Sequence, residues 1–187
     1  MSSQPLVSVI IAAYNHDPYI EDCINSVLQQ TYPNIELLVV DDGSKDDTAV
    51  RIEAMQAQHG FDFRVQENQG LARTLNDCIA RSHGSLIAPF GSADVMLPNR
   101  IQIQVDYMQD KPEVGICAGN IQMIGSAGMA LPKRNRERDF RRLDFEDIFI
   151  SDKPGAPAPT LLFRREALEA VGGFDPEICL LYTSDAA

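Results

Sequence analysis

Acidic side chains follow two of the apolar runs in this sequence, at the points where the predicted strands end. Asp41 and Asp42 come directly after the apolar run 35–40, and Asp94 lies in the loop after the run 86–90. A carboxylate can accept a hydrogen bond from the imide N–H of a uracil base or from a ribose hydroxyl. A loop carboxylate can also ligate Mg²⁺ or Mn²⁺ that bridges two phosphates. The spacing therefore indicates a nucleotide site, although each acid also suits a simple turn or helix start.

Basic side chains occur at two places that bear on binding. Arg73 lies in the first turn of the helix predicted over 70–84, near the positive end of the helix dipole. A cation does not stabilise a helix there, which favours a contact with an anion such as a diphosphate; an exposed surface arginine is the alternative interpretation. The run 133–142 carries six basic and two acidic side chains. It suits a phosphate of an acceptor or an anionic membrane surface, but a solvated face is the more common role of such a run.

Buried strands and amphipathic helices are expected to hold these side chains in place. The apolar run that begins at Val7 predicts a strand buried on both faces. It ends in four residues that leave room for a ligand, Ala12, Ala13, Tyr14 and Asn15. The segment 16–33 has apolar residues at helical spacing, with Asp17 as the expected N-cap, and Ser44 or Asp46 is the expected cap of the next helix.

Strand-then-helix units recur after the first one, at 35–60, 61–84 and 85–112. Four such units in succession predict an α/β fold, a mostly parallel sheet flanked by helices on both faces. A fifth strand is predicted over 114–125, leading into a hairpin or loop. The segment 158–175 predicts a strand followed by a short helix that stops at the glycine pair 172–173.

Composition excludes several classes of protein. The formal net charge of −11 and the pI near 4.6 argue against a general nucleic-acid binder. The four cysteines, Cys23, Cys78, Cys117 and Cys179, form no C-x-x-C pair, which favours free thiols in a reducing compartment. Since no window reaches about 18 apolar residues, we expect a soluble cytoplasmic chain.

The order and spacing of these segments resemble those of family 2 glycosyltransferases, which are inverting enzymes of the GT-A fold that use nucleotide-diphospho-sugars. The resemblance extends over nearly the whole chain and rests on six segments: VSVIIAAYN, QQTYP, IELLVVDDGSKDDT, NQGLARTLNDCIARSHGSLIAPF, the loop before Pro98, and FRREALEAVGGFD. It implies a UDP-linked donor and a saccharide or lipid-linked acceptor, with peripheral association at the inner face of a membrane as a further expectation. A G-x-G-x-x-G run, which a nicotinamide-dependent oxidoreductase would require, is absent after the first strand.

The resemblance also implies roles for individual residues. Tyr14 and Ala12 would line the nucleotide pocket, Asp42 would bind the base, and Arg73 would lie near the phosphates. With the neighbouring strand-end residues, the predicted nucleotide-binding set is Ala12, Tyr14, Asn15, Asp42, Arg73 and Ser92.

The chain departs from the family at the metal loop. The family carries an Asp-x-Asp-Asp run there, and its acidic positions are occupied by Gly91, Ala93 and Asp94, so only the last acid is retained. In an alternative register shortened by one residue, Asp94 is the metal ligand itself. In either register we expect weaker binding of Mg²⁺ or Mn²⁺ than is usual, or a metal held mainly by diphosphate and water.

A second departure concerns the general base, which the family supplies from an acidic pair shortly after the Gly-Gly-Phe-Asp stretch. Only twelve residues follow Asp175, and they contain no such pair. We therefore expect residues 1–178 to be an incomplete GT-A domain without its catalytic base, and residues 179–187 to be a truncated or non-native tail. This fragment is expected to be inactive, and a non-catalytic module that binds nucleotide-sugars is the alternative function.

Overall fold

The computed structural model describes residues 4–125, 128–131, 142–144, 146–147 and 155–177. The basic run 133–142, except Arg142, and the tail 179–187 lie outside these residues, as does Cys179. The predictions made for those segments therefore stay predictions.

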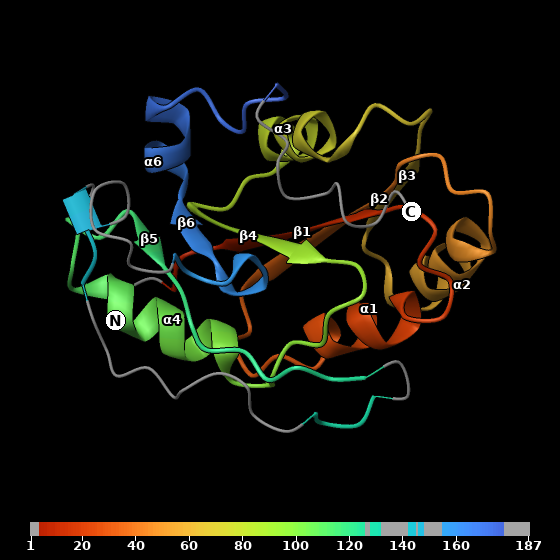
Figure 1. Cartoon of the computed structure of the whole chain (residues 1–187), viewed down its shortest axis with the longest axis horizontal. Helices are drawn as coiled ribbons and strands as arrows, with labels where there is room; N and C mark the ends of the chain where they lie inside the picture. The colour runs from red at the N-terminus through yellow and green to blue at the C-terminus, as the bar shows by residue number, and fades with distance from the viewer. Residues whose placement is uncertain (1–3, 126–127, 132–141, 145, 148–154, 178–187) are drawn as a thin grey trace.

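A six-stranded sheet in the order β3-β2-β1-β4-β6-β5 forms the centre of the molecule (Figure 1). Four strands are parallel and follow the predicted units: β1 (Val7–Ala13), β2 (Ile35–Asp41), β3 (Asp62–Val65) and β4 (Leu86–Gly91). Two short strands are antiparallel: β6 (Leu162–Arg164) pairs with β4, and β5 (Ile116–Cys117) pairs with β6. The prediction of a mostly parallel α/β sheet is confirmed, but the fifth strand is much shorter than 114–125.

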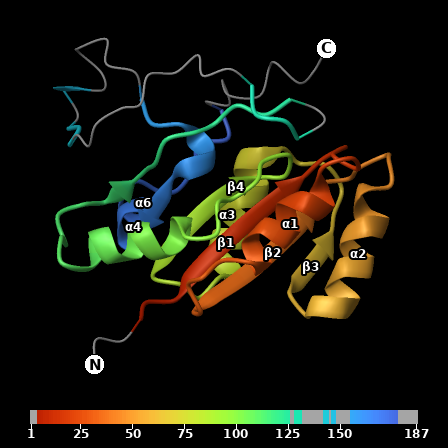
Figure 2. The same ribbon diagram turned by 90° about the horizontal axis from the view of Figure 1, so that it is seen from below.

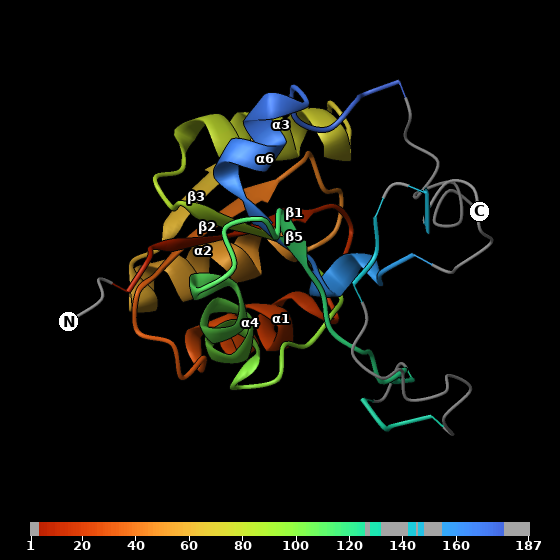
Figure 3. The same cartoon turned by 90° about the vertical axis from the view of Figure 1, so that its left-hand side faces the viewer.

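Helices cover both faces of the sheet, as Figure 3 shows from the side. On one face lie α1 (Ile20–Leu28), α2 (Thr48–His59) and α4 (Arg100–Gln109), which share one apolar core with alternate residues of β1 and β2 (Figure 2). On the other face, α3 (Leu71–Arg81) and α6 (Arg165–Ala170) pack on the opposite residues of the same strands. The 3₁₀ turn Ala158–Thr160 precedes β6. Strand β1 is buried on both faces, as its unbroken apolar run predicts.

The start of α1 differs from the prediction. The helix begins at Ile20 with Tyr19 at the N-cap position, and no side chain caps it. Asp17 instead forms an ion pair with Arg51 of α2, so a partner distant in sequence has replaced the local cap. For α2 neither predicted residue is the N-cap: that position is Asp47, and no side chain caps the helix there. Asp46 lies one residue earlier, and its Oδ1 accepts the N–H of Thr48, the first residue of the helix, at 3.1 Å.

The register of the central strands aligns their carboxyl ends. Ala13 pairs with Asp41, the last residue of β2, and Ala12 pairs with Gly91, the last residue of β4. The loops that follow β1, β2 and β4 therefore leave the sheet side by side, which is where ligands bind in open α/β sheets. Among the helices of the described residues, none is long and apolar enough to cross a membrane.

Candidate functional site

Hydrogen bonds join the loop after β1 to the loop after β2. The Asn15 N–H donates to Ser44 Oγ at 2.9 Å, and Asn15 Oδ1 accepts the Lys45 N–H at 2.8 Å. The neighbouring His16 N–H donates to Thr48 Oγ1 at 2.9 Å. Asn15 has a φ of 53°, in the left-handed region that asparagine tolerates better than most residues. The predicted site residue Asn15 thus holds two of the three loops together.

The loop after β4 is joined to the same group. His16 Nδ1 and Ser92 Oγ share a hydrogen bond of 2.5 Å. The Cys23 thiol of α1 donates to the Gly91 carbonyl at 3.3 Å. Burial and the nearby Asp94 raise the pKa of this thiol, so Cys23 stays protonated and acts as a donor. Ser92 is therefore placed with Asn15 at one edge of the sheet.

Asp42 is buried, with 4% exposure, and its carboxylate fixes the loop that leads into α3. Its Oδ1 accepts hydrogen bonds from Gln66 Nε2 at 2.8 Å and from the Gln69 N–H at 3.0 Å, and its Oδ2 accepts the Gly70 N–H at 3.0 Å. Since a carboxylate offers about four acceptor positions, roughly one remains for a ligand. Asp42 therefore has a structural role first, and its predicted contact with a base stays a prediction.

Its neighbour Asp41 is more deeply buried, with 1% exposure. Oδ1 accepts the Ser44 N–H at 2.9 Å, but Oδ2 has no hydrogen-bond partner among the described residues. Adjacent acids therefore differ sharply in the number of donors that surround them.

Three of the predicted site residues are at least partly exposed, and no side-chain hydrogen bond or ion pair among the described residues links them to the other predicted site residues. The Tyr14 ring is 42% exposed, and Ala12 is half-buried at the end of β1. Arg73 is exposed in the first turn of α3, and within the described part of the chain it forms no ion pair. Their predicted contacts with a base and a diphosphate stay predictions.

Asp94 lies in the turn that follows β4, where its N–H donates to the Gly91 carbonyl at 3.1 Å. Its carboxylate is folded back over Gly91, so that a Cβ built on that glycine would collide with Asp94 Oδ2. Burial raises the pKa of Asp94, while the nearby His16 and Arg100 lower it. The acid takes up the space that a side chain at position 91 would need, and it lies close to two basic side chains.

Arg100, the second of these, opens α4 and is half-buried. It donates from Nε to Gln104 Oε1 and from Nη2 to the Leu161 carbonyl, both at 3.0 Å, and its guanidinium lies 5.6 Å from the centre of the Phe90 ring. Burial lowers its pKa to about 10, a shift that Asp94 and Cys117 oppose. Its Nη1 is buried without a hydrogen-bond partner among the described residues.

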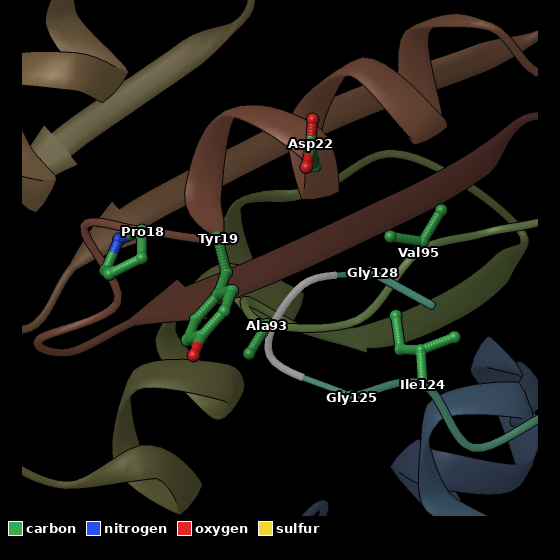
Figure 4. A pocket seen from close by; sticks show the side chains of 8 residues that line it. All are labelled: Pro18, Tyr19, Asp22, Ala93, Val95, Ile124, Gly125 and Gly128. Carbon is green, nitrogen blue, oxygen red and sulfur yellow. The ribbon is translucent and has the colours of Figure 1, made fainter. Parts of the chain in front are cut away.

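An open cavity of about 430 Å³ lies beside the Gly91–Asp94 loop (Figure 4). Tyr19 and Asp22 at the start of α1 form one wall, and Ala93 and Val95 form another. The segment around Ile124 lies across it, and Pro18, Gly125 and Gly128 complete the lining. None of the predicted nucleotide-binding residues lines this cavity, so it adjoins their loops without coinciding with them.

The sequence did not predict that Ser44, His16, Gln66 and Thr48 join the loops of the site, although Ser44 was a candidate helix cap. Ser44 lies in the predicted Asp-Asp-Gly-Ser turn and His16 follows Asn15, so both had a positional signal. Gln66 and Thr48 had none, because their partners lie in other loops.

Comparison with known proteins assigns the family. The family described as "Glycosyl transferase family 2" matches residues 8–172, and the chain belongs to this family. It is 33% identical to an uncharacterized glycosyltransferase of Nostoc sp. over 91% of this chain and 54% of that protein. It is 37% identical to one of Rickettsia prowazekii over 97% of this chain and 56% of that protein. The chain thus spans about half the length of these relatives.

Two solved structures share the fold, and both are bound to a nucleotide ligand. One is the mannosyltransferase PcManGT from Pyrobaculum calidifontis in complex with GDP-Man and Mn²⁺, with a TM-score of 0.72, 23% identity and coverage of 94% of this chain and 49% of that one. The other is S. aureus TarS 1–349 in complex with UDP, with a TM-score of 0.65, 21% identity and coverage of 92% and 51%. The predicted GT-A type of sheet is confirmed by these likenesses.

The donor set of the Gly91–Asp94 loop does not fit a divalent cation held by several protein ligands. Gly91 and Ala93 have no ligating atom, and Ser92 Oγ is engaged with His16. Hard cations require oxygen ligands, of which carboxylates are the usual protein source. Within the part of the chain that the structure describes, no three His, Cys, Asp or Glu side chains gather in a way that suits a metal ion. Asp94 is the one predicted ligand in this loop.

Proposed function

We propose that this chain is the donor-binding part of an inverting glycosyltransferase that moves a sugar from a UDP-linked donor to a hydroxyl of a saccharide or lipid-linked acceptor. One combination of observations supports the proposal. The family match extends over residues 8–172, and the loops after β1, β2 and β4 are hydrogen-bonded into one edge. That edge carries the exposed Tyr14 ring and the acceptor capacity left on Asp42. Aromatic stacking and a carboxylate acceptor are the means by which proteins recognise a base.

In the proposed reaction an acceptor oxygen attacks the anomeric carbon from the side opposite the diphosphate. A new C–O bond forms as the bond to the diphosphate oxygen breaks, and the electron pair leaves with the nucleoside diphosphate. A general base takes the proton of the acceptor hydroxyl. We propose that this base lies beyond Asp175 in the whole protein, and that residues 1–187 bind the donor but do not catalyse transfer. The residues proposed to bind it are Tyr14 at the base, Asp42 at the base N–H and Arg73 at the phosphates.

Calorimetric titration of UDP into the 187-residue chain tests this proposal. We expect measurable binding, and we expect Arg73→Gln to weaken it about tenfold, because a charge-assisted hydrogen bond contributes about 1.5–3 kcal/mol. Arg81→Gln is the matched control on the last turn of the same helix, where Arg81 bonds to Asp62 and Cys78. That change is expected to lower the melting temperature but not the affinity for UDP.

Absence of UDP binding by the folded chain would count against the proposal, as would equal losses of affinity in the two variants. Transfer of sugar to an acceptor by residues 1–187 alone would contradict the proposal that the base lies beyond Asp175.

A non-catalytic module that binds nucleotide-sugars is a second candidate, because the metal loop lacks acids at Gly91 and Ala93. The reading frame downstream of residue 187 distinguishes the two functions. An acidic pair soon after the Gly-Gly-Phe-Asp stretch of the native gene supports the enzyme, and its absence there supports the module. For either function we propose a cytoplasmic location, which the buried free thiols of Cys23 and Cys78 support.

A further inference from the structure

Asp94 is the single carboxylate of the loop Gly91–Asp94, and its side chain is folded back against Gly91. Gly91 and Ala93 have no ligating atom, and Ser92 Oγ shares a hydrogen bond with His16 Nδ1. Mg²⁺ and Mn²⁺ require oxygen ligands, of which carboxylates are the usual protein source. This loop therefore offers a divalent cation one carboxylate, and that carboxylate is turned toward its own backbone.

Position 93 differs from position 91 in the space around it. A side chain at 91 would meet the Asp94 carboxylate, which would have to turn aside to make room. Ala93, in contrast, is exposed, and its side chain borders the cavity of about 430 Å³ (Figure 4). A longer side chain at 93 therefore has room. Ala93 therefore lacks a ligating atom even though the space around it would accommodate a longer side chain that has one.

We propose that this chain binds a nucleoside diphosphate without a protein-held divalent cation, because Gly91 and Ala93 lack a ligating atom and the remaining carboxylate, that of Asp94, is folded back over Gly91. The class of ligand rests on the proposed function, whereas the statement about the metal does not. The negative charge of the diphosphate is then left to basic groups at the same edge, of which Arg73 is exposed in the first turn of α3.

The first test measures UDP affinity by calorimetry in excess EDTA and in excess Mn²⁺. For the unchanged chain we expect the two dissociation constants to agree within about twofold. Ala93→Asp adds a carboxylate where there is space, and we expect it to bind UDP about tenfold more tightly in Mn²⁺ than in EDTA. Ala93→Asn is the matched control, since it has the same shape without the charge, and we expect no such response to Mn²⁺.

The second test uses Mn²⁺ alone and does not require nucleotide binding. The paramagnetic resonance signal of free Mn²⁺ falls when the ion binds to protein. We expect the unchanged chain to leave the signal intact up to millimolar protein, and Ala93→Asp to lower it.

Three results would overturn the inference. The first is that the unchanged chain binds UDP about tenfold more weakly in EDTA than in Mn²⁺. The second is that the unchanged chain binds Mn²⁺ and that Asp94→Asn abolishes this binding. The third is that Ala93→Asp does not bind Mn²⁺ more tightly than the unchanged chain. If UDP binds to none of these proteins, the proposed function fails, and the resonance measurement still decides the inference about the metal.

Discussion

Strand β2 carries a carboxylate near each end, and the two have very different surroundings. Glu36, near its start, accepts hydrogen bonds from Ser8 Oγ, from the backbone N–H groups of His83 and Gly84, and from His83 Nδ1. Asp41, its last residue, accepts one from the Ser44 N–H, and its second oxygen is buried without a partner among the described residues. Both side chains lie on a sheet that the same core holds in place.

This difference in the number of hydrogen-bond donors indicates that the two edges of the sheet have different roles. At the amino edge, donors from β1 and from the turn before β4 converge on Glu36 and tie three strands together. At the carboxyl edge, the chain leaves an acceptor oxygen unused on Asp41, one acceptor position on Asp42 and an exposed ring at Tyr14. Buried polar groups normally find partners, so the capacity left unused at this edge by the described residues supports our proposal that a ligand binds there.

Gly84→Ala is expected to produce the largest effect and to confirm the role of the amino edge. A Cβ at Gly84 would lie 2.6 Å from the Ser8 nitrogen and 2.8 Å from the Leu6 carbonyl oxygen, and backbone atoms have little freedom to move. We expect a loss of about 3 kcal/mol in the free energy of unfolding, measured with urea. Gly60→Ala is the control, because nothing lies near a Cβ there and only its φ of 75° is unfavourable. A smaller loss for Gly84→Ala than for Gly60→Ala would show that this edge is loosely packed.

Glu36→Gln tests the hydrogen bonds of the amino edge and its dependence on pH. Burial alone would raise the pKa of Glu36, but the hydrogen bonds from Ser8, His83 and Gly84 outweigh it, and the pKa lies below its ordinary value of 4.5. The stabilisation is therefore complete above pH 4.5 and is lost as the pH falls through the lowered pKa. We expect Glu36→Gln to cost about 1–3 kcal/mol at neutral pH, because a neutral amide oxygen accepts the three hydrogen bonds now made to Oε1 less strongly than a carboxylate does, and the amide N–H₂ then faces His83 Nδ1.

The measurement is urea unfolding of both proteins at neutral pH and at a pH below the lowered pKa. The difference between them is expected to shrink at the lower pH, and a difference that stays constant would contradict the assignment. Glu53→Gln, on the exposed side of α2, provides the control for removal of a charge alone.

The parallel part of the fold could be predicted from the sequence because its signals are local. Unbroken Val and Ile runs followed by amphipathic segments define β1, β2 and β4 and the helices after them. The position of β6 could not be predicted in the same way. Its three residues pair with β4 on one side and with β5 on the other. Both partner strands are distant from β6 in the sequence, and no local pattern specifies such a pairing. The cap at Asp17 failed for the same reason, since Arg51 on another helix is its partner.

The site was predictable as a set of strand ends but not as a set of contacts. Asn15, Asp42, Ser92 and Asp94 all lie in loops at the carboxyl edge, as the alternation of strands and helices requires. The three internal hydrogen bonds of Asp42 and the closure of Asp94 over Gly91 depend on how neighbouring loops pack. Residue type alone does not reveal whether a carboxylate is already engaged.

Asp41→Asn is expected to have the smallest effect on stability and gives the most direct comparison with Glu36→Gln. Asparagine retains an oxygen for the Ser44 N–H, and it removes a buried charge whose second oxygen has no donor. We expect a change of less than about 1 kcal/mol in the free energy of unfolding at neutral pH. The two variants make the same chemical change near opposite ends of one strand, so the difference between them isolates the surrounding donors. A loss as large as that of Glu36→Gln would show that Asp41 Oδ2 has a donor after all, and the proposed contrast between the edges would then fail.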